Sequence, residues 1–93
     1  MLNTDTLMLL TKHGIGIFSN REDQYLQALI NTAMQEIEDT GIVIDGEDTS
    51  DLSLVATYAT WLYAQRKNGA AMPRFLQYRL HNRLLKECSK NGS

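Results

Sequence analysis

Residues 50–85 read SDLSLVATYATWLYAQRKNGAAMPRFLQYRLHNRLL and contain the only Trp and the only Pro of the chain. Ser50 is a favourable N-cap, and Asp51 places a negative charge in the first helical turn, where the helix dipole favours it. Gly69 is suited to the left-handed conformation that ends many helices, and Pro73 is suited to the first turn of a new one. The pattern predicts a central helix over about 51–68 and a last helix over about 73–88.

Apolar residues recur in both predicted helices at spacings of three and four, which is the period of a helix and not of a strand. The stripes are Leu52, Val55, Ala56, Ala59, Leu62 and Tyr63, with Leu54, Tyr58 and Trp61 beside them, and then Leu76, Leu80, Leu84 and Cys88. The wide apolar surface of the first helix indicates that other elements pack on more than one side of it. We therefore expect it to be central, and from these two helices we expect eight core residues. They are Val55, Ala59, Trp61, Leu62, Tyr63, Leu76, Leu80 and Leu84.

Two further helices are predicted in the first half of the chain. A short helix over about 4–13 ends at Gly14, and a connector follows whose Ile15, Ile17 and Phe18 are expected to anchor in the core. Ser19 or Asn20 then caps a long helix over about 20–40. Its expected core residues form a regular stripe. They are Leu26, Leu29, Ile30, Ala33 and Ile37.

These elements predict an all-α fold in which one short and three longer helices form a compact bundle. A chain of 93 residues is the size of one domain, so residues 1–93 are expected to form a single helical domain. The loop over 41–50, GIVIDGEDTS, is expected to be irregular because Asp45-Gly46 is a strong turn signal. The tail over 89–93 loses the apolar rhythm and is expected to fray.

The net charge of −2 hides an uneven distribution. Up to Ser50 there are nine acidic and two basic residues, a balance of −7, whereas from Asp51 there are seven basic and two acidic residues, a balance of +5. The two halves neutralise one another within one fold, or the acidic half of one subunit meets the basic half of the next, or the basic half binds nucleic acid. The sequence leaves these three interpretations open.

The chain lacks the motifs of the common enzyme and cofactor classes. Gly14 and Gly16 are followed by Ser19 where a dinucleotide-binding loop needs a third glycine, and the acidic loop fails the calcium-loop pattern at its sixth and twelfth positions. A single cysteine and two histidines give no structural zinc pattern. No apolar run approaches the length of a membrane span. We expect no enzymatic activity, cofactor, metal, small-molecule substrate or membrane association.

Residues 57–85, TYATWLYAQRKNGAAMPRFLQYRLHNRLL, resemble the signature of the small head-tail connector (adaptor) proteins of tailed phages and prophages. In that family a helix with an aromatic pair and an Arg precedes a short loop, a Met-Pro or similar dipeptide, and a last helix with Leu and Arg. The matching residues here are Trp61, Tyr63, Arg66, Met72, Pro73, Leu76, Leu80 and Arg83. Residues 3–41 are similar in having a short helix, a turn and a long helix that ends near a Thr-Gly pair, so the resemblance covers most of the chain and is weakest in the 41–50 loop.

The resemblance implies a structural virion protein. Such subunits assemble as a homo-oligomeric ring below the portal, extend the channel for double-stranded DNA, and dock the next neck or tail protein. The implied partners are other copies of the chain, the portal protein above, a neck or tail completion protein below, and the DNA in the lumen. The implied location is the virion neck, after assembly in the host cytoplasm.

Eight charged residues are candidates for a subunit interface or a surface that faces DNA. They are Glu22, Glu36, Glu38, Arg66, Arg74, Arg79, Arg83 and Lys86. The charge distribution predicts that acidic residues of the first half meet Arg74, Arg79 or Arg83 of a neighbouring subunit. The alternative is a small helical nucleic-acid-binding module, in which the basic last helix, with Tyr78 and Asn82, follows phosphates or reads a major groove.

Overall fold

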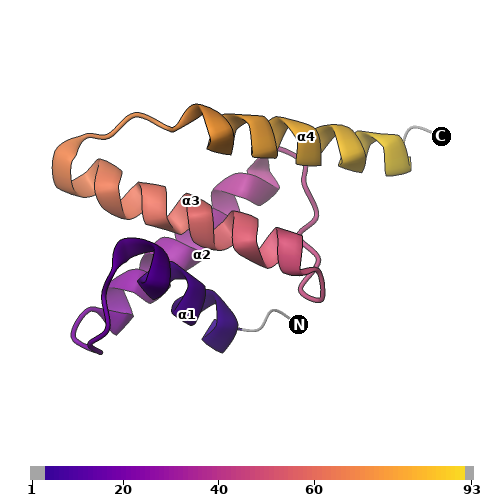
Figure 1. The fold of residues 1–93 in the computed structure, drawn as a ribbon. Coiled ribbons are helices and arrows are strands. Elements are labelled where there is room, and N and C mark those ends of the chain that lie inside the picture. Colours follow the sequence, from indigo (N-terminus) through magenta and orange to yellow (C-terminus); the bar gives the residue numbers. More distant parts are fainter. Residues whose placement is uncertain (1–3, 92–93) are drawn as a thin grey trace.

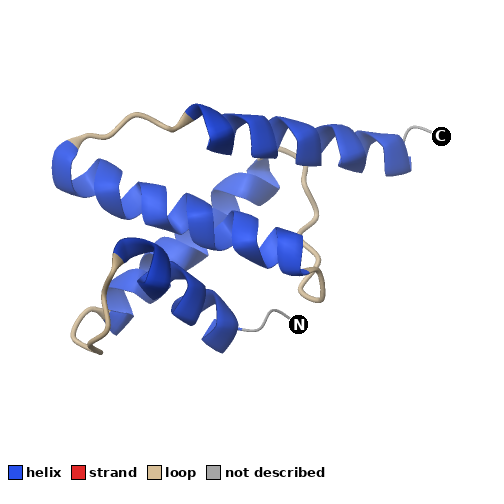
Figure 2. Cartoon of the chain, viewed as in Figure 1, coloured by secondary structure: helices blue, strands red, loops and turns tan. Residues whose placement is uncertain are grey.

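The computed structural model describes residues 4–91, and within them there are four helices and no strand (Figures 1 and 2). The helices are α1 (Thr4–Ile15), α2 (Asp23–Asp39), α3 (Thr49–Asn68) and α4 (Arg74–Asn91). The predicted all-α class, with one short and three longer helices, is confirmed. Residues 41–48, between α2 and α3, contain turns and no regular element.

Helix α3 lies at the centre of the bundle. It packs against α1, α2 and α4, and α1 and α2 also contact one another. Figure 1 shows α4 running along one side of α3, with α1 on the other side and α2 crossing behind. Eight residues of α3 are buried, and they lie around most of its circumference, as its wide apolar surface predicts. By contrast α4 packs mainly against α3, which leaves much of its surface exposed.

The core agrees closely with the predicted stripes. Nine of the predicted core residues are buried: Leu26, Leu29, Ile30, Ala33, Ile37, Val55, Ala59, Leu62 and Leu76. The other four, Trp61, Tyr63, Leu80 and Leu84, are partly buried and pack against this cluster. The indole of Trp61 donates to the carbonyl oxygen of Ala70 at 3.0 Å, which fixes the connector between α3 and α4. Leu7, Ile42, Leu52, Leu54 and Tyr58 complete the core.

The helix ends differ from the prediction in several places. Helix α2 begins at Asp23, three residues later than expected, with Glu22 as its N-cap and no side-chain capping bond. Helix α3 is capped by Asp48, whose carboxylate accepts from the backbone N–H of Ser50 at 2.8 Å, so Ser50 lies inside the helix. Asp48 is the better cap because its carboxylate is negatively charged and also interacts favourably with the positive end of the helix dipole. Gly69 ends α3 in the left-handed conformation, as predicted.

Three expectations about apolar and terminal residues were wrong. Phe18 is 85% exposed and does not anchor in the core, whereas Ile15 and Ile17 pack against the core as expected. Helix α4 continues through residues 89–91, which were expected to fray, and residues 92–93 lie outside the described range. Cys88, the last member of the predicted stripe, is exposed because a spacing of four residues advances 40° more than a full turn at each step. The stripe therefore leaves the packed side of the helix.

Candidate assembly surface on the last helix

Helix α4 presents one packed face to the rest of the molecule. The residues of this inner face are Leu76, Leu80, Arg83, Leu84 and Glu87. Leu76 is fully buried, and the two charged residues, Arg83 and Glu87, are only 9% and 6% exposed. Because buried charges are costly unless they are paired and hydrogen-bonded, their partners decide how α4 is held.

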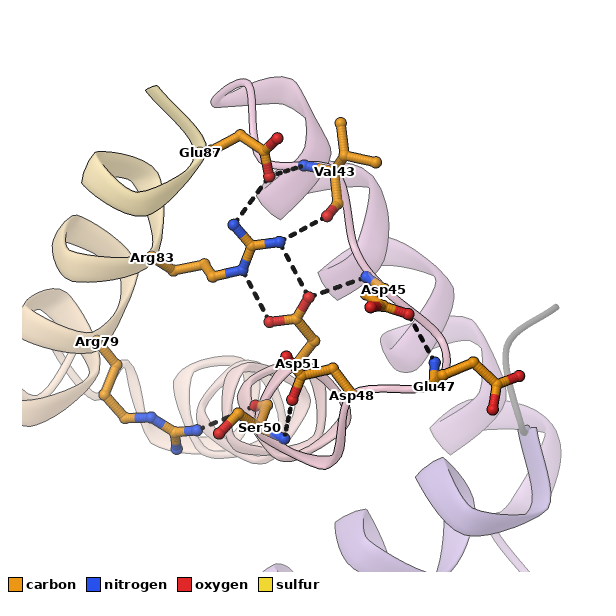
Figure 3. A network of polar contacts seen from close by, with 9 residues as sticks. All are labelled: Val43, Asp45, Glu47, Asp48, Ser50, Asp51, Arg79, Arg83 and Glu87. Atoms are coloured by element: carbon orange, nitrogen blue, oxygen red, sulfur yellow. Dashed lines mark hydrogen bonds and ion pairs between the residues drawn. The ribbon is translucent and has the colours of Figure 1, made fainter. Parts of the chain in front are cut away.

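Figure 3 shows that the Arg83 guanidinium is surrounded by acceptors from two other segments. Its Nε donates to Asp51 Oδ1 at 2.8 Å and its Nη2 donates to Asp51 Oδ2 at 3.1 Å, a bidentate arrangement that suits the planar guanidinium. Nη1 donates to Glu87 Oε1 at 2.8 Å, and Nη2 also donates to the carbonyl oxygen of Val43 at 2.7 Å. Arg83 thus joins α4 to the start of α3 and to the loop before it.

The two carboxylates also bind the backbone of that loop. Asp51 Oδ2 accepts from the N–H of Asp45 at 2.9 Å, and Glu87 Oε1 accepts from the N–H of Val43 at 3.2 Å. Burial alone would raise the pKa of Asp51, but the hydrogen bonds from Arg83 and Asp45 hold it below its ordinary value. The Arg83 guanidinium, and then the Val43 N–H, lower the pKa of Glu87 in the same way. The network therefore stabilises the ionised form of both carboxylates.

The position of Arg83 corrects one prediction. It was expected to face a neighbouring subunit or DNA, but it is buried, and each of its three guanidinium nitrogens donates to an acceptor inside the molecule. Its register gives the reason, since Arg83 lies seven residues after Leu76 and three after Leu80, on the packed side of the helix. Glu87 lies four residues later on the same side of the helix, and this spacing was the sequence signal for the Arg83–Glu87 ion pair. Asp51, its main partner, is 32 residues away and was assigned only to the helix dipole.

The opposite side of α4 carries a second stripe, which we call the outer stripe and define as Phe75, Tyr78, Asn82 and Leu85. Their spacing of three, four and three keeps them on one side of the helix. At 100° per residue, the centre of this stripe is roughly 160° from the centre of the inner face. Phe75, Tyr78 and Leu85 are 58%, 70% and 54% exposed. Tyr78 and Leu85 therefore point away from the domain, whereas Phe75 and Asn82, at the edge of the stripe, border grooves between α4 and α3.

The remaining predicted basic residues lie at the surface. Arg66, Arg74 and Lys86 are exposed, and none of them forms an ion pair within the described part of the chain. Arg79 is half-buried and donates to the Ser50 carbonyl oxygen and to Thr57 Oγ1, each at 3.3 Å.

Arg79 and Lys86 also border an open groove of about 270 Å³ between the start of α3 and α4. The groove is further lined by Ser50, Asp51, Leu54, Asn82 and Arg83.

The predicted acidic residues divide into two kinds. Glu22 accepts a hydrogen bond from the hydroxyl of Tyr63 at 3.2 Å, and Glu36 accepts one from the hydroxyl of Tyr58 at 2.6 Å. Both carboxylates are thus engaged within the same molecule, and burial together with Glu36 raises the pKa of Tyr58. Glu38 is different, since it is exposed and its carboxylate forms no hydrogen bond or ion pair with residues 4–91.

The uneven charge is not compensated by ion pairs between the two halves. Among the described residues there are three ion pairs, and each joins residues of the same half: Lys12 with Asp23 at 2.6 Å, and Arg83 with Asp51 and with Glu87 at 2.8 Å. The acidic Glu38 and the basic Arg66, Arg74 and Lys86 are left facing solvent. These four exposed side chains therefore form no ion pair within residues 4–91.

Residues 4–91 include no helix of the length and apolar character that a membrane span requires. Within the same range, no group of three or more His, Cys, Asp or Glu side chains is arranged to hold a metal ion. Comparison of the chain with protein-family models, with curated protein sequences and with solved structures found no match.

Proposed function

We propose that this chain is the subunit of a homo-oligomeric ring and acts as a head-tail connector. In this role the ring lies below the portal in the virion neck, extends the channel for double-stranded DNA, and docks the next neck or tail protein. The observation that carries the proposal is the outer stripe of α4, because a helix with one packed face and one exposed apolar stripe is a helix that lacks a partner. The resemblance of residues 3–41 and 57–85 to head-tail connectors indicates that the assembly is a ring of the connector kind.

The charges support a ring more than a symmetric dimer. A two-fold dimer brings the same surface of both subunits together, so the basic rim of one α4 would meet the basic rim of the other. A ring uses two different surfaces on each subunit, which allows a basic surface to meet an acidic one at every interface. The separation of charge along this chain suits the second arrangement.

The alternative, a nucleic-acid-binding module, is less favoured by the geometry. Arg83 would have to leave Asp51 and Glu87 to reach a phosphate, which would strand two carboxylates at a buried site. Arg79 is partly engaged with α3. The exposed cations that remain on α4, Arg74, Lys86 and Lys90, are interrupted by Phe75, Tyr78 and Leu85. The surface of α4 is therefore better suited to protein than to a phosphate backbone.

Light scattering after size separation, over a range of protein and salt concentrations, tests the proposal. A closed oligomer of one defined mass is the expected result, because a ring stops growing when its last interface closes. A monomer that binds duplex DNA with an affinity that falls steeply with salt would instead support the nucleic-acid module and overturn the connector.

A further inference from the structure

The outer stripe of α4 has a chemical counterpart elsewhere on the same chain. We define the acidic segment as residues 38–48, which join the end of α2 to the N-cap of α3. Its Val43 side chain is 66% exposed, and Figure 3 shows it pointing away from the Arg83 network. Glu38 and Glu47, five residues before and four residues after Val43 in the sequence, are exposed, and neither carboxylate has a partner among the described residues.

The two surfaces match in both polarity and charge. The outer stripe has apolar Tyr78 and Leu85, with the exposed cations Arg74 and Lys86 on its two flanks. In the acidic segment, the exposed apolar Val43 lies between Glu38 and Glu47 along the sequence. Opposite charges around a central apolar contact are the usual arrangement of a specific interface, and they disfavour pairing of either surface with itself.

The two surfaces also point in opposite directions. Arg83 and Glu87, on the inner face of α4, bond directly to Val43, so the acidic segment lies on the inner side of that helix. The outer stripe is turned to the other side of α4, roughly 160° away. One molecule cannot bring its own two surfaces together, but successive copies can do so head to tail.

We propose that the outer stripe of α4 docks on the acidic segment of a second copy of this chain. This contact rests on the proposed ring and names the two surfaces that build it. The Arg83 network positions both surfaces. It fixes the loop that presents Val43, and it holds α4 so that its outer stripe faces outward. Each subunit then uses one surface toward each neighbour.

Two variants with reversed charge test this contact. The first, Arg74→Glu/Lys86→Glu, makes the rim of α4 acidic, and the second, Glu38→Lys/Glu47→Lys, makes the segment basic. Each variant alone should lose the oligomer, because its two surfaces then carry like charges. An equimolar mixture should restore it with alternating subunits, since each reversed surface meets a complementary one. Native mass spectrometry of the mixture measures both composition and copy number.

Matched single substitutions separate the contact from general effects. Lys86→Glu should weaken assembly at least tenfold, whereas Arg21→Glu, an exposed cation outside both surfaces, should leave it unchanged. Leu85→Ser should weaken assembly, whereas Leu9→Ser, on an α1 leucine that is 70% exposed, should not. Thermal melts followed by circular dichroism confirm that each variant is folded.

The outcomes distinguish this contact from the ring itself. A wild-type ring whose mass survives either double reversal, or a mixture of the two variants that stays monomeric, overturns the docking of α4 on the acidic segment and leaves the connector in place. A wild-type chain that is monomeric at every concentration overturns both. Restoration of the ring only in the mixture would establish that α4 pairs with the acidic segment, because the sample contains no DNA and no other protein.

Discussion

Arg83 Nε lies 2.8 Å from Asp51 Oδ1, and this buried ion pair fastens the last helix to the first turn of the central one. The same guanidinium reaches Glu87 and the carbonyl oxygen of Val43, so three segments meet at one side chain. Helix α4 packs mainly on α3, and Leu76 is its only fully buried apolar residue within the described chain. The network therefore sets the orientation of α4 and, with it, the direction of the outer stripe.

Replacement of Arg83 should destabilise the fold severely. In Arg83→Met the Asp51 carboxylate stays buried without its cation, and loss of one partner of a buried pair costs about 3–5 kcal/mol. Arg79→Met, on the same helix with two long hydrogen bonds, should cost about 1 kcal/mol. Urea denaturation of both variants gives the free energies of unfolding. Equal losses would show that the Arg83 network has no special role.

Stability should fall in acid because of the same carboxylates. The folded-state pKa values of Asp51 and Glu87 lie below their ordinary values of 3.8 and 4.5, so the unfolded chain binds more protons at acidic pH. This contribution is complete above the ordinary values and is lost as pH falls through the lower folded-state values. The urea midpoint of the wild type should therefore drop from about pH 5 downward. The drop should be shallower in Arg83→Met, and an identical pH profile would contradict the assignment.

Gly14 should be required where α1 crosses α3. A Cβ at this position would lie 2.9 Å from Thr60 Oγ1, closer than packed atoms allow. Gly14→Ala should therefore destabilise the fold by about 1–3 kcal/mol, although alanine favours a helix. Gly14→Ala/Thr60→Ala removes the obstructing hydroxyl and should recover stability relative to Gly14→Ala, with Thr60→Ala as the control. Thermal unfolding measures all three, and a stabilising Gly14→Ala would show that α1 shifts freely.

Gly69 should be needed for the end of α3. Its φ of 70° lies in the left-handed region, where a Cβ costs roughly 1–2 kcal/mol. Gly69→Ala should be destabilising by about that amount, and Gly69→Asn by less, because asparagine tolerates this conformation better. Equal melting temperatures for the two variants would contradict this explanation.

Local signals predicted most of the fold. The stripe from Leu26 to Ile37 and the αL glycine at 69 depend on neighbours within a turn or two, and both were read correctly. The cap of α3 was misplaced by two residues because Asp48 and Ser50 are both good caps, and only the local geometry chooses between them.

The candidate assembly surface was harder to predict because pairing between residues far apart in the sequence decides which side chains of α4 are exposed. An arginine on a basic helix is usually exposed, so Arg83 was assigned to the surface, and its Asp51 partner comes from a distant part of the chain. Tyr63 and Tyr58 likewise engage Glu22 and Glu36 across 41 and 22 residues. The outer stripe was visible as the flanking residues Phe75, Tyr78 and Leu85, but its direction depends on which face of α4 the network holds inward.

The most direct test of the connector is electron microscopy of the purified full-length chain, with class averages of its particles in negative stain. We expect round particles of one rotational symmetry with a central channel, since heterologous contacts close around an axis. Particles of the size of a monomer or of a two-fold dimer, at concentrations where the protein is fully folded, would contradict it.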